Sequence, residues 1–187
     1  MPDDPRYEEV IFAKILEYPG CEFLEIGTRT GRFSIPCAQH IKKVNGHVDT
    51  VDFGGDFVVD PTKTVTFNMK SERQYIAQTR IRKEKLWDHI TTYYCGANAF
   101  FKRNLRKYDV IFIDGDHCYE QGGRDLENAT KALRKGGIIF MHDIKEMTQN
   151  LPVNKNVKRA FLEFDKVGFT KRMHEDIFDM GIIQCVR

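Results

Sequence analysis

Two carboxylates and an imidazole follow an apolar run in the middle of the chain, and these residue types can bind a metal ion or transfer a proton. The residues are Asp114, Asp116 and His117, and the run before them is Tyr108–Ile113. Such a run predicts a buried strand, so the three side chains should emerge together at its carboxyl end. In open parallel α/β sheets, ligands bind at that edge. The segment is therefore the first candidate for a catalytic site.

The elements that would position these side chains alternate between strands and helices. Apolar runs predict strands at 22–26, 48–53, 90–94, 109–113, 138–141, 170–173 and 181–186. Helical spacing predicts helices at 7–18, 33–44, 71–89, 98–107, 120–134 and 156–166, with a loop or short strand at 61–70 and Ser71 as a cap. This alternation indicates an α/β fold with a Rossmann-like, doubly wound, mostly parallel seven-stranded sheet and helices on both faces. At 187 residues without a repeat or linker, we expect one domain spanning 1–187.

Composition narrows the class of protein. A net charge of +2 with 41% hydrophobic residues is typical of a soluble globular protein, and the charge is too small to argue alone for nucleic acid, which we expect to be an unlikely partner. Met1–Arg6 is too acidic and polar for a signal peptide, and no apolar run approaches the ~18 residues of a membrane span. The five cysteines are odd in number and lack CxxC spacing, which favours a reduced, cytoplasmic setting without disulfides.

A glycine turn should follow the first strand. Glu25 ends the strand, and Gly27 and Gly31 follow with the spacing GxxxG. Glycines there let the backbone approach a ligand, but the GxGxxG spacing of dinucleotide sites is missing, which weighs against NAD. Asp52, at the end of the second strand, stands where an acid commonly accepts hydrogen bonds from a ribose. A tight turn with close helix packing is the alternative interpretation.

These motifs resemble those of class I S-adenosylmethionine-dependent methyltransferases, over about residues 20–145. The second half is similar to the subgroup of macrolide-sugar O-methyltransferases and cephalosporin-hydroxylase-like proteins. The motifs that carry the resemblance are Phe23–Gly31, Val51–Asp52, Asp109–His117, Tyr119–Glu120, Lys135–Gly137 and His142–Asp143. The resemblance implies a last strand that is antiparallel to the others.

The resemblance also implies S-adenosylmethionine as the cofactor. The acid ending strand one would contact the methionine moiety, the glycine turn would pass beside the cofactor, and the acid after strand two would hold the ribose. Phe53 and the turn at 96–98 would flank the adenine. The cofactor-binding residues implied in this way are Glu25, Gly27, Thr28, Arg29, Gly31, Asp52, Phe53, Ala97, Asn98 and Asp114.

A divalent metal site is expected next to the cofactor. Asp114 follows the fourth strand and His142–Asp143 follows the fifth, so parallel pairing should bring them to one edge. Related metal-dependent O-methyltransferases imply these three residues as ligands of Mg²⁺ or Mn²⁺, although imidazole suits Mn²⁺ better than Mg²⁺. Such an ion lowers the pKa of a substrate hydroxyl. The alternative is that the His142–Asp143 pair belongs to a solvated loop.

Two histidines are candidates for the general base. His117 and His142 both carry an imidazole with an unperturbed pKa near 6.5, suited to proton transfer near neutrality. With Asp114 they make up the predicted catalytic residues. For Asp116, a role as the cap of the helix that begins near Tyr119 is as well supported as a role in the chemistry.

The expected activity is metal-assisted O-methylation of a small-molecule or sugar hydroxyl. The basic segment 70–85 allows RNA as an alternative acceptor, although a solvated helix with apolar residues on its inner side is the preferred explanation. A third alternative is a catalytically inactive cofactor-binding protein of the same fold. We expect no membrane partner, and the short loops leave room for a homodimer in which a second subunit helps to close the pocket.

Overall fold

The computed structural model describes residues 6–53, 57–59, 72–116, 118–144, 153–174 and 180–186. The expectations for His117, for the Ser71 cap and for the segment 61–70 lie outside these ranges.

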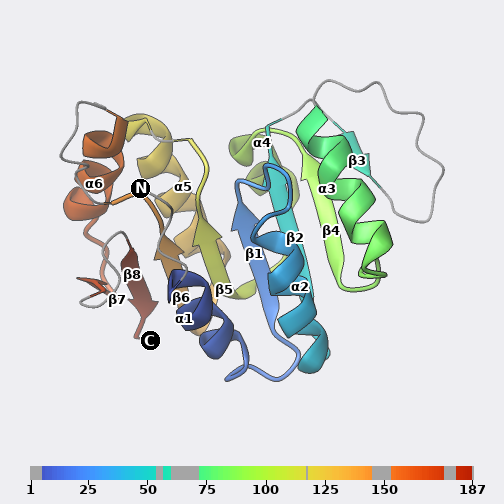
Figure 1. Ribbon diagram of the computed structural model, residues 1–187. Coiled ribbons are helices and arrows are strands. Elements are labelled where there is room, and N and C mark those ends of the chain that lie inside the picture. Colours follow the sequence, from blue (N-terminus) through green and yellow to red (C-terminus); the bar gives the residue numbers. More distant parts are fainter. Residues whose placement is uncertain are drawn as a thin grey trace.

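A mixed sheet of eight strands forms the centre of the described structure (Figure 1). Its order is β3-β4-β2-β1-β5-β6-β8-β7, with β4, β2, β1, β5 and β6 parallel and β8 antiparallel to both of its neighbours. The predicted fold class is confirmed, and the short β3 adds an antiparallel edge strand to the seven that were predicted. The strands are β1 Glu22–Ile26, β2 His47–Asp52, β3 Phe57–Val59, β4 Ile90–Tyr94, β5 Tyr108–Ile113, β6 Leu133–Met141, β7 Phe169–Met173 and β8 Gly181–Cys185.

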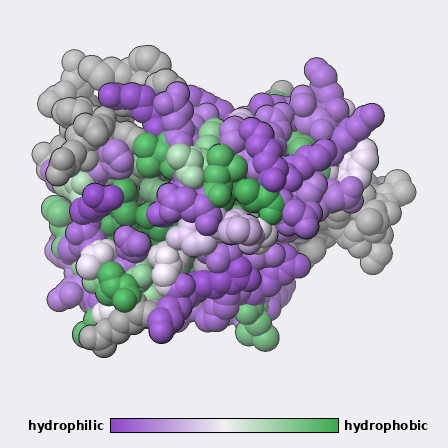
Figure 2. All heavy atoms as spheres, turned by 90° about the horizontal axis from the view of Figure 1, so that it is seen from below, coloured by the Kyte–Doolittle hydropathy of each residue, from purple (hydrophilic) through white to green (hydrophobic). Residues whose placement is uncertain are grey.

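Helices cover both faces of the sheet. One apolar cluster joins α1, α2 and α3 to the sheet, and a second joins α4, α5 and α6 to its other face. The helices are α1 Arg6–Ile15, α2 Ser34–Lys43, α3 Glu72–Lys83, α4 Ala97–Arg103, α5 Tyr119–Ala132 and α6 Val153–Glu163. Within the described part of the chain, no helix is long and apolar enough to cross a membrane. Seen from below, where the parallel strands begin, the surface is largely hydrophilic, with apolar side chains gathered near its middle (Figure 2).

Burial on both faces explains the continuous apolar runs of the central strands. In β1, Phe23 belongs to the cluster under α1 and α2, whereas Leu24 and Ile26 belong to the cluster under α5. A strand that is covered on both sides loses the alternation of polar and apolar residues. The pattern therefore located the central strands, although β6 begins at Leu133, five residues before the predicted strand, and α5 ends at Ala132.

Helix α3 ends earlier than its sequence predicts. Lys85 has a left-handed backbone (φ 53°), its N–H donates to the carbonyl of Arg82 at 3.1 Å, and the N–H of Leu86 donates to that of Ile81 at 3.1 Å. These two bonds form a Schellman motif, in which glycine is the usual left-handed residue. Leu86 turns back into the core with 2% exposure.

The strand order reverses between β1 and β5, and their ends meet there. The N–H of Asp114 donates to the carbonyl of Ile26 at 2.8 Å, and the N–H of Gly27 donates to the carbonyl of Val51 at 2.7 Å. Gly27 has a φ of 111°, and a Cβ on it would lie 2.1 Å from the carbonyl oxygen of Asp114. Only a residue without a side chain fits at this switch point, where open α/β sheets bind ligands.

We expect Gly27→Ala to lower the free energy of unfolding by about 3 kcal/mol or more, because its methyl group would overlap backbone atoms and its φ would be strained. Urea denaturation measures the change. Gly123→Ala is the matched control, because a Cβ at Gly123 in α5 has no neighbour within 4 Å. That variant should be as stable as the wild type or more stable, by about 0.5–1 kcal/mol. Equal unfolding curves for Gly27→Ala and wild type would contradict the steric argument.

Candidate active site

A cavity of about 570 Å³ lies over the switch point at the carboxyl edge of the sheet. Its size falls within the usual range for pockets that bind small molecules. Most of the predicted cofactor-binding residues line it. They are Gly27, Arg29, Asp52, Phe53, Ala97, Asn98 and Asp114.

Asp52 connects the end of β2 to the glycine turn. Its Oδ2 accepts the backbone N–H of Arg29 at 2.5 Å, and the N–H of Phe53 also bonds to the carboxylate. Burial raises the pKa of Asp52 although these two donors oppose the rise. Arg29 adopts a left-handed backbone (φ 47°), which directs its N–H toward Asp52. The carboxylate is thereby fixed at the wall of the cavity.

Three predicted cofactor residues lie behind this wall. Glu25 is 1% exposed, and the hydroxyls of Ser34 and Thr50 both donate to its Oε2. Burial raises the pKa of Glu25 to about 8, although the two hydroxyls lower it. Thr28, with 2% exposure, shares a hydrogen bond of 2.5 Å with the Thr50 hydroxyl. Gly31 (φ 72°) leads the chain into α2. These residues support the turn from beneath.

Asp114, His142 and Asp143 come together as predicted, and their ligand atoms lie within 4.8 Å of one another. The Nδ1 atom of His142 is 3.5 Å from Asp114 Oδ1 and 3.4 Å from Asp143 Oδ1. It is buried and has no hydrogen-bond partner among the described residues. Charge-assisted hydrogen bonds are shorter, about 2.7–2.9 Å. Ligands held about 2.1 Å from one ion lie about 3.0–3.4 Å apart, and the two distances from His142 Nδ1 are close to that range, so these residue types could hold a divalent metal.

Backbone and aromatic contacts hold His142 and Asp143 in place. The N–H of His142 donates to the carbonyl of Ile113 at 3.0 Å, and Asp143 has a left-handed φ of 58°. The rings of Tyr7 and Phe112 lie 4.7 Å and 6.1 Å from the imidazole. Aspartate tolerates the left-handed region better than most residues, yet the conformation is uncommon and points to a functional constraint.

The electrostatics of His142 favour the protonated imidazolium and disfavour a general base. Burial lowers the pKa of this imidazole, but Asp114 and Asp143 together outweigh burial and raise the pKa to about 10. An imidazolium at neutral pH cannot accept a proton from a substrate. The position therefore suits an ion-pair partner, or a ligand whose proton is displaced by a metal.

Asp116 does not cap α5 as the sequence allowed, because the N-cap residue is Cys118 and no side chain of the described residues caps the helix. Its Oδ1 accepts the N–H of Cys118 at 3.0 Å, and Cys118 is the residue before α5. This is an Asx turn, in which the side chain bonds the backbone two residues further on. Asp116 also lines the cavity.

Arg73 of the basic segment also lines the cavity, together with Gln121 and Asp125, which the sequence did not single out. Asp125 is 1% exposed, and burial raises its pKa to about 6. The only signal in the sequence is that Gln121 and Asp125 are four residues apart, which places them on one face of a helix. That spacing is too common to indicate a site.

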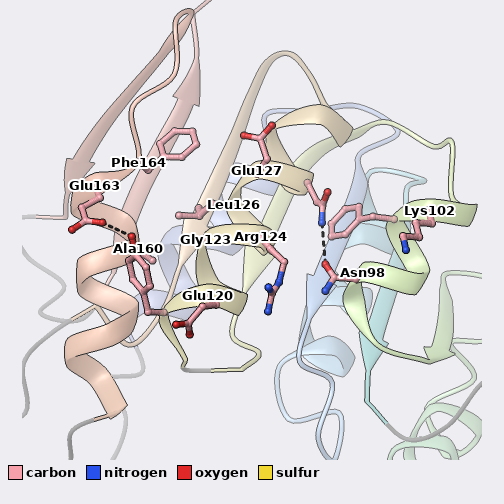
Figure 3. A pocket seen from close by; sticks show the side chains of 13 residues that line it. Asn98, Lys102, Glu120, Gly123, Arg124, Leu126, Glu127, Ala160, Glu163 and Phe164 are labelled. Atoms are coloured by element: carbon pink, nitrogen blue, oxygen red, sulfur yellow. Dashed lines mark hydrogen bonds between the residues drawn. The ribbon is translucent and has the colours of Figure 1, made fainter.

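A second hollow of about 800 Å³ lies on the outer surface between α4, α5 and α6 (Figure 3). Among the described site residues that the sequence predicted, Asn98 alone contributes to it. Leu126 and Phe164 point into this region, and the Glu163 carboxylate accepts the hydroxyl of Tyr119 at its side. The predicted site residues that line a cavity therefore lie mainly around the smaller one.

Stability should depend on pH through Glu25. Its pKa is about 8 in the folded chain, against a usual value of 4.5, so the folded state holds a proton that the unfolded state releases. This contribution is complete below about pH 4.5 and is lost as pH rises toward 8, by at most about 1.4 kcal/mol per unit. Glu25→Gln should remove it. Urea denaturation of both proteins at pH 5, 6, 7 and 8 measures the difference, and parallel pH profiles would contradict a buried, protonated Glu25.

Comparison with known proteins places this site in a family. The sequence model of a methyltransferase-domain family matches residues 24–144. A search of curated proteins gave no match. The motifs that predicted a methyltransferase run from Phe23 to Asp143, and all of them except Phe23 lie within the matched segment.

Solved structures share the fold. An O-methyltransferase from Bacillus cereus in complex with SAH (S-adenosylhomocysteine) has a TM-score of 0.71 and 20% identity, covering 98% of this chain and 82% of that one. The SAH-bound methyltransferase PaMTH1 of Podospora anserina has a TM-score of 0.76 and 12% identity, covering 99% and 80%. TomG, an O-methyltransferase of Streptomyces achromogenes involved in tomaymycin synthesis and solved with SAM, has a TM-score of 0.66 and 15% identity, covering 100% and 81%.

The family match covers more than half of the chain, and the strand order and the glycine turn agree with it. The resemblance seen in the sequence is thereby confirmed, and the chain belongs to the class I S-adenosylmethionine-dependent methyltransferases.

Proposed function

We propose that this methyltransferase transfers a methyl group to a hydroxyl oxygen of a small molecule or sugar, with help from a divalent metal ion. One observation carries the proposal: Asp114 lines the cavity and also belongs to the cluster with His142 and Asp143. A hydroxyl bound at that cluster would lie beside the end of the cavity. Residues 1–187 would act as one methyltransferase domain.

In this proposal the cofactor occupies the cavity of about 570 Å³. S-adenosylmethionine supplies an electrophilic methyl group. Asp52 would accept hydrogen bonds from the ribose, Gly27 would allow close backbone approach, and Phe53 and Ala97 would flank the adenine. Glu25 would act indirectly, by holding the turn from beneath. The SAH- and SAM-bound structures of the same fold support this placement.

Asp114, His142 and Asp143 would hold the metal. The buried Nδ1 atom and the two carboxylates fit a divalent ion, and the imidazole favours Mn²⁺ over Mg²⁺. A bound ion would supply Lewis acidity that lowers the pKa of the acceptor hydroxyl and orients its oxygen. His117, the other imidazole that the sequence places near the end of β5, would be the base that removes the proton.

Two alternatives remain open to test. RNA methylation would use the cations Arg73, Arg82 and Lys83 on α3, and RNA affinity that falls steeply with salt would support it. A cofactor-binding protein without activity would bind SAH and transfer no methyl group to any hydroxyl acceptor.

A homodimer would appear as twice the mass in sedimentation equilibrium.

Saturating SAH should raise the thermal midpoint of the wild type, since a ligand at 100 times its Kd stabilises by about 2.7 kcal/mol. Asp52→Ala should weaken SAH binding roughly 10- to 100-fold, because the ribose loses its charged acceptor. Calorimetric titration gives both affinities. Asp88→Ala, at an exposed acid after α3, is the control and should bind like the wild type. A wild type that gives no heat and no thermal shift with SAH would contradict the cofactor assignment.

Asp143→Asn should weaken Mn²⁺ binding by at least about 10-fold, because it removes a charged ligand while asparagine still tolerates the left-handed backbone. Electron paramagnetic resonance of free Mn²⁺ measures the affinity without any activity assay. Asp165→Asn, at an exposed position after α6, should leave the affinity unchanged. Equal Mn²⁺ affinity in Asp143→Asn and wild type would mean that the cluster is an internal ion pair only.

A further inference from the structure

Asp125 is a buried carboxylate that the proposed reaction does not use. It projects from α5, is 1% exposed and lines the cavity. The side-chain amide of Gln121 donates to Oδ1 at 2.7 Å. No described residue donates to Oδ2, which lies next to the loop after β5: a Cβ on Gly115 would be 3.9 Å away. One oxygen is thus fixed by the protein, and the other is left as an acceptor.

A network of amides holds this carboxylate in one orientation. The Nδ2 group of Asn98 donates to Gln121 Oε1 at 3.1 Å, and the guanidinium of Arg124 donates to the same oxygen at 3.3 Å. Asn128 in turn donates to Asn98 Oδ1 at 3.3 Å, a bond that Figure 3 draws at the Asn98 side chain. Because the Gln121 oxygen is occupied, its NH₂ group must face Asp125. The acceptor at Oδ2 is therefore preorganised.

Asn98 and Gln121 connect Asp125 to the part of the cavity where the proposed function places the purine. Asn98, Gln121 and Asp125 line the cavity together with Phe53 and Ala97, and Asn98 directly follows Ala97 in the chain. This step rests on the proposed function, in which Phe53 and Ala97 flank the adenine. The purine would then lie next to the network between α4 and α5.

We propose that Asp125 determines cofactor specificity by accepting a hydrogen bond from the exocyclic amine of the purine, with Gln121 and Asn98 as positioning residues. A 6-amino group offers a hydrogen to the carboxylate. A 6-oxo group turns its lone pairs toward a buried anion, which is unfavourable in a desolvated site. Burial raises the pKa of Asp125 to about 6, and an amine donor would favour the ionised form.

The test compares SAH with S-inosylhomocysteine, which carries oxygen in place of that amine, by calorimetric titration. The wild type should bind SAH roughly 10- to 100-fold more tightly. In Asp125→Asn the amide can turn its NH₂ to the 6-oxo group, so the ratio of the two affinities should fall to about 1 or reverse. Glu127→Gln is the matched acid-to-amide control, exposed on the same helix and outside this cavity, and it should keep the wild-type ratio.

The outcomes separate this inference from the proposed function. A wild type that binds neither compound overturns the proposed cofactor site and this inference with it. A wild type that binds SAH but accepts both compounds equally overturns the role of Asp125 alone, and this comparison needs no variant to fold. An unchanged ratio in a folded Asp125→Asn protein would also overturn it.

Discussion

The close approach of Gly27 to the carbonyl of Asp114 is the contact on which the rest of the site depends. It brings the end of β1 against the end of β5 at the point where the strand order reverses, and the N–H of Asp114 bonds to Ile26 there. The missing side chain leaves the floor of the cavity open. The same contact fixes the backbone of Asp114, so that one residue belongs to both the cavity and the cluster with His142.

The charges around this contact suit a positively charged ligand. Four carboxylates line the cavity, and burial raises the pKa of two of them, Asp52 and Asp125. A sulfonium would relieve the repulsion among such groups, whereas a dinucleotide phosphate would add to it. The cationic side chains in the lining, Arg29 and Arg73, approach from the glycine turn and from α3. Burial also raises the pKa of Glu25 beneath the turn, which keeps a further negative charge away from the site at neutral pH.

The sequence predicted the features that strong local signals specify. Apolar runs located the parallel strands, and the residues that follow them converged at one edge, including Asp114 and the His142–Asp143 pair. Other features depend on tertiary contacts that have no local signal. Lys85 takes the left-handed position that glycine normally marks, Asp125 reaches the cavity only because α5 packs beside β5, and Glu25 lies behind the wall because Ser34 and Thr50 bind it there.

The ring of Tyr7 lies against the imidazole of His142, although Tyr7 precedes the segment 24–144 that the family shares. The surroundings of this imidazole therefore include a residue outside the segment that the family model matches. If the proposed metal is bound here, a different leading helix would change the shape and polarity of the wall behind the imidazole and leave the three proposed ligands the same. Exchange of a peripheral helix would then adjust the affinity for the ion without altering any residue of the matched motifs.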